Sequence, residues 1–495
     1  MPEEYYTTIG LEIHAELKTN SKMFCGCKNN PDEKVPNKNI CPVCMAHPGT
    51  LPVINKKAVE SVIKVGLALE ANIADFTEFD RKNYFYPDIP KSYQISQYKY
   101  PIVSGGELNG VKITRVHLEE DTATSKHPEG KITSYGASDK NGYSLVDFNR
   151  ASIPLMELVT EPVIHSAEEA GNFGRELQLL LRYLGVSEAN MEKGQMRVEL
   201  NISVSKDPNK FGTKVEVKNI NSFRAMERAA AYETKRMISL IESGKNNEIV
   251  QETRGWDENK QATFSQRSKE NANDYRYFPD PDLPKLFLSK IFDIEKLKNE
   301  LPELPQAKRL RYKNDFGIKD EDIESYIVDK EMGDWFEKVA LEFLQGISSR
   351  SEVERGDSLA KIRVASNYIT SDYLGLKKSN LNIKLPKVEN FAELINMVAE
   401  NKISSRAAKD ILAMIVIEDN SPMAIAEAED LLQKNDEGEL KEIIQKIISA
   451  NEAIVATYKG GKENALMSLV GQVMKETKGS ANPNLVQKLL KELLR

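Results

Sequence analysis

The hydrophobic pattern changes its period once along the chain, and this change limits the fold. Up to about residue 290, short segments alternate apolar and polar side chains, which is typical of half-buried β-strands. From Ser404 onward, apolar residues instead recur every three or four positions, as they do on amphipathic helices. The pattern predicts an α+β protein with a large, mainly antiparallel sheet first and a helical region after it.

The alternation is clearest in four segments that contain β-branched residues and are separated by Gly, Asn and Asp turns. These segments are 10–17, 110–115, 197–204 and 214–218. A helix is expected over residues 166–184, because Ser166 begins a capping-box sequence and leucines follow at helical spacing. The first part of the chain should therefore combine a sheet with covering helices.

The chain is too long for one hydrophobic core, so several domains are expected for its 495 residues. Three prolines between residues 274 and 284 predict an irregular segment that ends the first domain. We expect a mixed α/β domain over 1–292, a helical domain over 293–403 and a helical tail over 404–495.

Composition indicates a cytoplasmic protein that does not enter a membrane. No apolar run approaches the ~18 residues that cross a bilayer, and the acidic start lacks a signal-peptide core. The net charge is −7, so binding to RNA would require local basic patches. One such patch lies in residues 459–495, which contain seven Lys or Arg residues but only three Glu residues. From composition alone, a solvated helix face is the slightly favoured interpretation of this patch. The candidate lysines are Lys459, Lys462, Lys475 and Lys478.

All four cysteines of the chain lie within twenty residues. Cys25 and Cys27 form one pair, Cys41 and Cys44 form another, and 13 residues separate the pairs. Two short thiolate pairs can ligate one Zn²⁺ tetrahedrally, and four protein ligands would make the site structural. A redox pair or unpaired buried thiols are the alternatives.

Charged side chains share faces on several of the expected strands, since the side-chain period of a strand is two. Glu120 instead continues the apolar side of Val116 and Leu118, so it should need a partner. These faces are either ordinary solvated surfaces or the walls of a groove for Mg²⁺ and phosphate. The shared faces hold Glu12, His14 and Glu16; Arg197, Glu199 and Asn201; and Lys214, Glu216 and Lys218.

Common nucleotide and hydrolase motifs are absent from the sequence. It contains neither GxxxxGK[ST] nor GxGxxG, so a bound ATP would lie outside the usual loop-and-helix cradle. It also lacks the GxSxG elbow, and nothing indicates an amidase within this chain.

A long, ordered series of motifs resembles the B subunit of aspartyl/glutamyl-tRNA amidotransferases. The motifs are Gly10-Leu-Glu-Ile-His-Ala-Glu-Leu, Asp80-Arg-Lys-Asn-Tyr-Phe-Tyr-Pro-Asp, Lys91-Ser-Tyr-Gln-Ile-Ser-Gln, His117-Leu-Glu-Glu-Asp, Leu155-Met-Glu-Leu-Val-Thr-Glu-Pro, Lys218-Asn-Ile-Asn-Ser-Phe, Gln251-Glu-Thr-Arg and Asp274-Tyr-Arg-Tyr-Phe-Pro-Asp-Pro-Asp. Residues 469–483 resemble that family's tail domain.

The resemblance implies a glutamine-dependent carbon–nitrogen ligase with a kinase-like site in its first ~290 residues. Such a protein phosphorylates the side-chain carboxylate of Glu-tRNA(Gln) or Asp-tRNA(Asn) with ATP and Mg²⁺, and ammonia then displaces phosphate. An amidase A subunit would supply the ammonia through a channel. A small C subunit would complete the heterotrimer, and the tail would bind tRNA.

Family positions also imply roles for individual residues. Glu12, His14, Glu120 and Glu157 are the expected catalytic residues and Mg²⁺ ligands. Arg197, Glu199, Asn201 and Lys218 would support nucleotide and metal, and Lys82 and Lys91 would line the ammonia path. The family usually has Asp where this chain has Glu199, which puts the metal role of that residue in doubt. The alternative function is a non-catalytic scaffold that binds tRNA.

Overall fold

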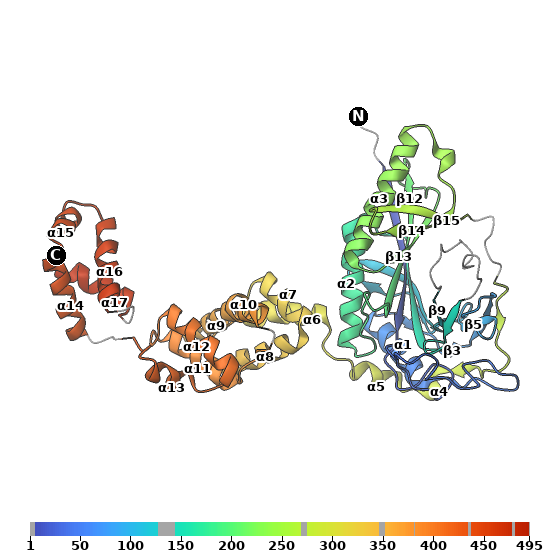
Figure 1. Ribbon diagram of the computed structural model, residues 1–495, viewed down its shortest axis with the longest axis horizontal. Helices are drawn as coiled ribbons and strands as arrows, with labels where there is room; N and C mark the ends of the chain where they lie inside the picture. Colours follow the sequence, from blue (N-terminus) through green and yellow to red (C-terminus); the bar gives the residue numbers. More distant parts are fainter. Residues whose placement is uncertain are drawn as a thin grey trace. The chain divides into compact units, whose positions relative to one another are not determined.

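The computed structural model describes residues 5–126, 144–268, 275–345, 352–380, 382–433, 437–477 and 481–494. The chain divides into two compact units, Met1–Pro305 and Gln306–Arg495. The first unit contains the sheets and the second is helical, which confirms the predicted α+β class (Figure 1). The finer division at residues 292 and 403 stays a prediction. Within the described ranges, no helix has the length and apolar character to cross a bilayer.

A ten-stranded sheet forms the centre of the first unit. Its strands follow the order β15-β14-β13-β12-β1-β11-β8-β6-β2, with β7 beside β8. Every pairing in it is antiparallel except that of β13 with β14. The four segments predicted as strands lie in β1, β8, β12 and β13. The strands are β1 (Tyr6–Glu16), β2 (Asn72–Ile73), β6 (Val103–Ser104), β7 (Glu107–Leu108), β8 (Val111–Glu120), β11 (Pro154–Thr160), β12 (Met196–Ser205), β13 (Val215–Ile220), β14 (Glu252–Asp257) and β15 (Ala262–Ser268).

One face of this sheet is buried beneath helices α1 (Lys56–Ala68), α2 (Ala167–Tyr183) and α3 (Phe223–Glu242), of which Figure 1 shows α2 and α3 alongside the strands. Leu11 and Ile13 of β1 are buried there. The predicted cap of α2 is confirmed, because the Ser166 hydroxyl accepts a hydrogen bond from the Glu169 amide. The helices take up the apolar face, so the alternate side chains of the same strands project to the other side.

Three small sheets complete the first unit. They pair β16 (Phe278–Pro279) with β4 (Asp80–Asn83) and β5 (Tyr93–Ser96), β17 (Leu286–Phe287) with β3 (Phe76–Thr77), and β10 (Leu145–Asp147) with β9 (Thr124–Lys126). The prediction that residues 274–284 contain no regular structure is wrong at β16, which pairs with β4. Proline is tolerated there because an edge strand pairs on one side only.

The second unit contains helices throughout its described residues, as the apolar periodicity predicts. The stripe around Ile411 and Ile415 is buried, and Leu440, Ile444 and Ile447 pack into a separate apolar cluster near the C-terminus. The remaining helices of the chain are η1 (Asn246–Glu248), α4 (Leu288–Ile291), α5 (Ile294–Asn299), α6 (Pro305–Arg311), η3 (Tyr312–Phe316), α7 (Asp320–Val328), α8 (Lys330–Leu344), α9 (Glu352–Asn367), η5 (Tyr368–Tyr373), α10 (Leu374–Ser379), α11 (Val388–Ala399), α12 (Ser405–Glu418), α13 (Pro422–Ala428), α14 (Glu437–Ala450), α15 (Glu452–Lys459), α16 (Asn464–Glu476) and α17 (Pro483–Leu493).

Candidate active site and metal centre

Strand register brings charged side chains of four strands into one row. His14 of β1 pairs with Glu157 of β11 on one side and with Arg197 of β12 on the other. Glu157 in turn pairs with His117 of β8. Residues directly opposite each other in an antiparallel sheet project to the same face. The row therefore lies on the face that the helices leave uncovered.

The centre of the row is a compact cluster around His14. Its Nε2 atom lies 3.4 Å from an Oε atom of Glu119 and 3.4 Å from one of Glu157. The Oε1 atom of Glu12 is slightly farther from the same His14 Nε2 atom, at 3.9 Å. The His117 Nε2 atom also approaches Glu157, at 3.4 Å. Two overlapping groups of potential ligand atoms result, in which all atoms lie within 4.8 Å of one another: Glu12, His14 and Glu199, and His14, Glu119 and Glu157.

The electrostatics of this cluster favour positive charge. Burial, followed by the charges of Glu157 and Glu199, raises the pKa of Glu12 to about 7. Burial opposes protonation of His14, but its hydrogen bond to Glu157 and the charge of Glu119 outweigh it and raise the His14 pKa to about 9. Without a metal, protons partly neutralise the carboxylates. A divalent cation can take over that role.

The structure does not bring Glu120 to this cluster; Glu119 lies there instead. Glu120 projects to the other face of β8, where its Oε1 lies 2.6 Å from Lys91 Nζ and accepts a hydrogen bond from the Ile95 amide. The sequence prediction that Glu120 needs a partner is thus confirmed. The same alternation excludes Glu120 from the row, because neighbouring residues of a strand point to opposite faces.

Sequence reasoning missed Glu119 and His117. Both are buried, and both lie on the same face of β8 as Arg115, whose guanidinium is 3.5 Å from Glu157. The signal was present in the alternation, which places residues 115, 117 and 119 on one side. Only the register with β11 shows that this side meets His14.

The predicted support residues divide between two neighbourhoods. Glu199 lies opposite Glu12, and Lys218 approaches it at 2.8 Å. Asn201 lies farther along β12, opposite Gly10. The Arg197 guanidinium instead forms an ion pair with Asp121, with its nitrogen 2.7 Å from the carboxylate oxygen. Lys218 and Glu199 therefore border the cluster directly, whereas Arg197 belongs to an adjoining network.

That network links four charged residues of different segments. Asp121 accepts hydrogen bonds from Arg150, at 2.6 Å, and from Arg197. Arg150 also donates to Glu16, whose pKa burial raises to about 7 despite the arginine. The two guanidiniums lower the pKa of Asp121 although burial opposes this. Arg150 thus connects the end of β1 to the row of charged residues.

Lys82 and Lys91 have different carboxylate neighbours. Lys82 is largely buried, which disfavours its charge, but the carboxylates of Glu119 and Glu157 and the neighbouring tyrosines raise its pKa. Its ammonium lies 5.1 Å from the ring centroid of Tyr275. Lys82 therefore borders the carboxylate cluster, whereas Lys91 pairs with Glu120.

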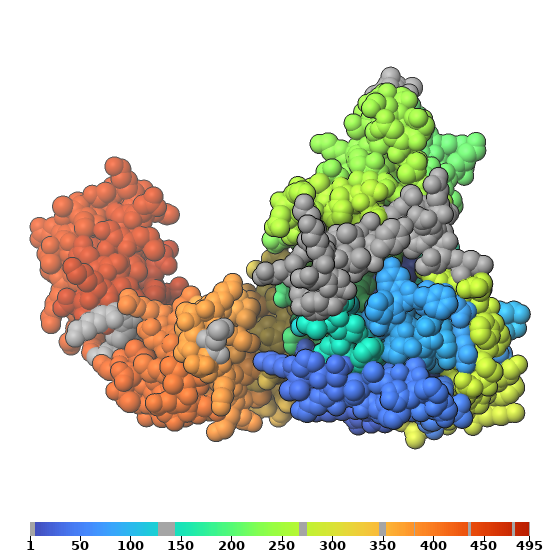
Figure 2. Space-filling model, turned by 45° about the vertical axis from the view of Figure 1, so that its right-hand side comes forward, coloured from blue at the N-terminus to red at the C-terminus, as the bar shows by residue number. Residues whose placement is uncertain are grey.

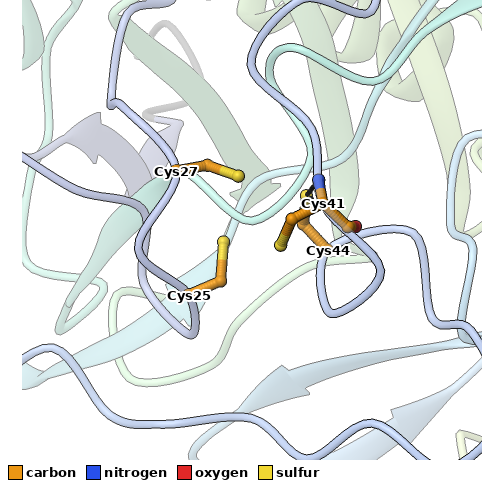
Figure 3. A group of neighbouring side chains, drawn as sticks. All are labelled: Cys25, Cys27, Cys41 and Cys44. Carbon is orange, nitrogen blue, oxygen red and sulfur yellow. Dashed lines mark hydrogen bonds between the residues drawn. The ribbon is translucent and has the colours of Figure 1, made fainter.

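The four cysteines converge from two loops. They lie in the segment between β1 and α1, whose surface is blue in Figure 2; Cys44 is buried and the other three are half-buried. Figure 3 shows the sulfurs of Cys25, Cys27, Cys41 and Cys44 pointing toward a common centre, and all four lie within 4.8 Å of one another. Tetrahedral Zn–S bonds of ~2.3 Å require sulfurs at about this spacing. The residues thus fit a zinc ion.

A fully buried lysine lies beside these cysteines. Lys22 Nζ is 3.9 Å from Cys44 Sγ and donates a hydrogen bond to the Phe148 carbonyl at 3.0 Å. A hydrogen bond from Cys25 and the charge of Lys22 lower the pKa of Cys44 to about 5, although burial opposes this. The surroundings therefore stabilise the thiolate of Cys44, the form that binds metal. The hydrogen bond to Cys44 raises the pKa of Cys25, and burial raises the pKa of Cys27 to about 11, so these two thiols lose their protons only when a metal replaces them.

The loop between the cysteine pairs also holds the turn that precedes Arg150. The Asn37 amide donates to Asp147 at 2.9 Å, and the Asn39 amide donates to the Asn149 side chain at 2.8 Å. Asn149 Nδ2 donates back to the Val35 carbonyl. The cysteine segment is thus connected, through residues 147–149, to the Arg150 network.

Three of the four candidate tail lysines are exposed. Lys459 ends α15, Lys462 follows in the loop and Lys475 lies in the last turn of α16. Lys478 lies outside the described residues. Lysines near helix C-termini extend toward solvent, where they can meet phosphate groups.

Comparisons with known proteins agree along the whole chain. A family model described as the GatB/GatE catalytic domain matches residues 7–292, and one described as the GatB domain matches residues 354–494. The B subunit of the aspartyl/glutamyl-tRNA(Asn/Gln) amidotransferase from Gloeothece citriformis is 42% identical, covering 99% of this chain and 98% of its own. The protein of the same description from Brevibacillus brevis is 43% identical and covers 99% of both chains.

These matches place the first unit in the class of GatB/GatE catalytic domains. The chain belongs to the family of aspartyl/glutamyl-tRNA(Asn/Gln) amidotransferase B subunits, which confirms the resemblance found in the sequence.

The affinity of the carboxylate cluster for a divalent cation is expected to rise with pH. A cation competes with the Glu12 proton near pH 7 and with the His14 proton near pH 9. Electron paramagnetic resonance titration with Mn²⁺, from about pH 6 to about pH 9, measures this dependence. Glu12→Gln should lose the part of the rise near pH 7. An affinity that does not change with pH contradicts the assignment.

Lys22→Met is expected to weaken zinc binding by about 10- to 100-fold, because it removes the cation beside Cys44. Zinc content and the rate of zinc loss to a chromogenic chelator measure the effect. Lys28→Met is the matched control, since Lys28 lies in the same segment with an exposed side chain. Equal zinc retention by both variants would show that Lys22 has no influence on the metal.

Proposed function

We propose that this chain is the part of the enzyme that amidates misacylated tRNA, converting Glu-tRNA(Gln) or Asp-tRNA(Asn) to Gln-tRNA(Gln) or Asn-tRNA(Asn). The observation that carries the proposal is identity above 40% over 99% of the chain with B subunits of that description. The cluster around His14 gives this function a physical basis within the first unit. A scaffold that only binds tRNA would have no use for so costly a group of buried carboxylates.

The reaction must turn a poor electrophile into a reactive one. Phosphorylation of the side-chain carboxylate by ATP creates a leaving group that ammonia displaces. When bound, Mg²⁺ would neutralise phosphate charge. Glu12, His14, Glu119 and Glu157 would hold it, because His14 shares one group of potential ligand atoms with Glu119 and Glu157 and an overlapping group with Glu12 and Glu199. Glu119 thus replaces Glu120 in the ligand set that the sequence predicted.

Neighbouring cations of this chain would orient the phosphates. Lys218 lies beside Glu199 at one border of the cluster, and Lys82 lies near Glu119 at another. Neighbouring carboxylates raise the pKa of both lysines, so both amines stay protonated. Each therefore offers a permanent positive charge to a phosphate group. Positioning and charge of this kind supply most of the catalysis in phosphoryl transfer.

Ammonia would reach the cluster along Lys82 and Lys91. The Lys91–Glu120 pair lies directly across β8 from Glu119, so it could exchange hydrogen bonds with a small polar species. Glu120 is 3% exposed, and its second carboxylate oxygen has no hydrogen-bond partner among the described residues. A group left unsatisfied in this way can accept from a passing ammonia molecule.

We further infer the partners and the metal of the cysteine cluster. An amidase A subunit would supply ammonia and a small C subunit would complete the assembly. The four cysteines would hold one structural Zn²⁺, which would support the turn before Arg150 through the contacts of Asn37 and Asn39. The tail lysines would contact tRNA phosphates.

Glu119→Gln is expected to lower ATP-dependent amidation by roughly 100-fold or more, because a neutral amide cannot replace a charged ligand. Glutaminase activity of the assembled complex should remain. The assay follows ADP and amidated tRNA after misacylated tRNA is added. Glu242→Gln, at the exposed end of α3, is the control. Full amidation by Glu119→Gln would refute the site. No ATP turnover by the unmodified complex would support the scaffold instead.

Replacing Lys459, Lys462 and Lys475 together by Gln is expected to weaken tRNA binding and to reduce its salt dependence. Each phosphate contact contributes about one to the slope of log affinity against log salt. Filter binding at several salt concentrations measures both quantities. The charge-matched control is Lys210, Lys245 and Lys260 replaced by Gln, all exposed in the first unit. Equal slopes for the two triple variants would show that the tail does not bind tRNA.

A further inference from the structure

The motif Gln251-Glu-Thr-Arg has no part in the site described above. Its last three residues begin β14, the strand that pairs in parallel with β13. The register places Thr253 opposite Glu216, and Glu216 lies opposite Asn201 of β12 on its other side. Residues that lie opposite each other in a sheet project to the same face. Thr253 and Glu216 therefore share the face that carries the carboxylate cluster.

A hydrogen bond joins the two strands on that face. The Thr253 hydroxyl donates to Glu216 Oε2 at 2.7 Å. The other carboxylate oxygen, Oε1, lies 3.6 Å from Lys218 Nζ, and Glu199 Oε2 is 2.8 Å from the same nitrogen. Glu199 in turn lies opposite Glu12. A continuous series of contacts thus runs from Thr253 to the border of the cluster.

The two charged side chains in the middle of this series are not held by packing alone. The side chain of Lys218 is 40% exposed and that of Glu216 is 25% exposed. Long charged side chains lose conformational entropy when they are held in one geometry, so an ion pair between them needs further contacts to stay ordered. Threonine has few rotamers because its side chain is β-branched. The Thr253 hydroxyl is therefore a rigid anchor for one oxygen of Glu216.

The neighbours of Thr253 attach β14 to helix α3 on the opposite face. Arg254 donates to the Thr263 hydroxyl at 2.9 Å and lies 3.5 Å from Glu233, which is fully buried. Arg254 also donates to Glu252 at 2.5 Å. A slip of one residue in β14 would separate Arg254 from Glu233, and breaking a buried ion pair is costly. The network therefore keeps Thr253 on the open face.

A second contact fixes β13 against β14 next to Lys218. Asn219 has a φ of 64°, in the left-handed region that asparagine adopts more readily than most residues. Its side-chain amide donates a hydrogen bond to the Trp256 carbonyl at 3.0 Å. The motif that begins at Lys218 is thus joined to the strand that carries Thr253. The backbone beneath both side chains is fixed.

We propose that Thr253 and Glu216 are positioning residues that hold the Lys218 ammonium beside the carboxylate cluster. The Thr253 hydroxyl fixes one oxygen of Glu216, and the other oxygen shares Lys218 with Glu199. The inference rests on the proposed function, in which Lys218 orients phosphate groups. A cation that is already in place needs no rearrangement while charge develops in phosphoryl transfer. Neither Thr253 nor Glu216 has to touch the substrate for this role.

The test uses Thr253→Val in the assembled complex, because valine keeps the branched shape and removes the hydroxyl. The kcat/KM for amidation should fall by about 3- to 10-fold, the effect of one hydrogen bond. Thr253→Ser keeps the hydroxyl and should stay within about twofold of the unmodified complex. Thr114→Val is the matched control, because it removes a hydroxyl that donates to Glu161 at the same 2.7 Å in the same sheet.

A double-mutant cycle tests whether Thr253 acts through Glu216. Glu216→Ala should lower kcat/KM at least as much as Thr253→Val does, and Thr253→Val should have no further effect in that background. Losses that add would overturn the proposal. So would a loss of equal size in Thr253→Ser or in Thr114→Val, since the position of Lys218 would then not be the cause.

Chemical labelling reports on Lys218 without catalysis. Burial lowers the pKa of Lys218, but the charges of Glu199 and Glu216 raise it above its ordinary value. Acetic anhydride reacts with the unprotonated amine, so mass spectrometry should find Lys218 acylated faster in Thr253→Val than in Thr253→Ser. Lys214, exposed in the same segment, is the internal reference.

Equal acylation of Lys218 in the two variants would overturn the proposal. Absence of amidation by the unmodified complex would instead refute the proposed function. The labelling result does not depend on turnover, so the two failures are distinguishable.

Discussion

The pairing of β1 with β11 and β12 is the constraint on which the site depends. It places His14 between Glu157 and Arg197, and β8 then adds His117 and Glu119 on the same face. Carboxylates packed this closely repel one another unless protons or a cation neutralise them. The helices on the apolar face hold the strands in register, since a slip of one residue would expose the core side chains. Packing on one face thus maintains an unfavourable charge arrangement on the other.

The segment that carries the four cysteines is connected to this cluster through a series of hydrogen bonds. The cysteine segment holds the turn of residues 147–149, and Arg150 carries that contact to Glu16 and Asp121. The segment that carries the cysteines is therefore connected, through Arg150, to Asp121 beside the row of charged residues.

The fold was largely predictable from periodicity, because strands and helices bury apolar side chains at different spacings. The first unit's main strands and the capping of α2 followed from local sequence. The choice between Glu119 and Glu120 did not follow. Family motifs contain both carboxylates in sequence, and alternation assigns them to opposite faces without naming the face that meets His14. Likewise, β16 formed in a proline-rich segment because β4 offered it a free edge.

By itself, the sequence determined the family, the succession of sheet and helices, and the close spacing of the cysteines, since each depends on residues near one another in the chain. Tertiary structure decided which carboxylates meet, that Lys91 pairs with Glu120, and that Tyr98 stacks on Tyr277. Those contacts join residues separated by tens to hundreds of positions. Their existence depends on strand register and on packing between segments, which local pattern does not specify.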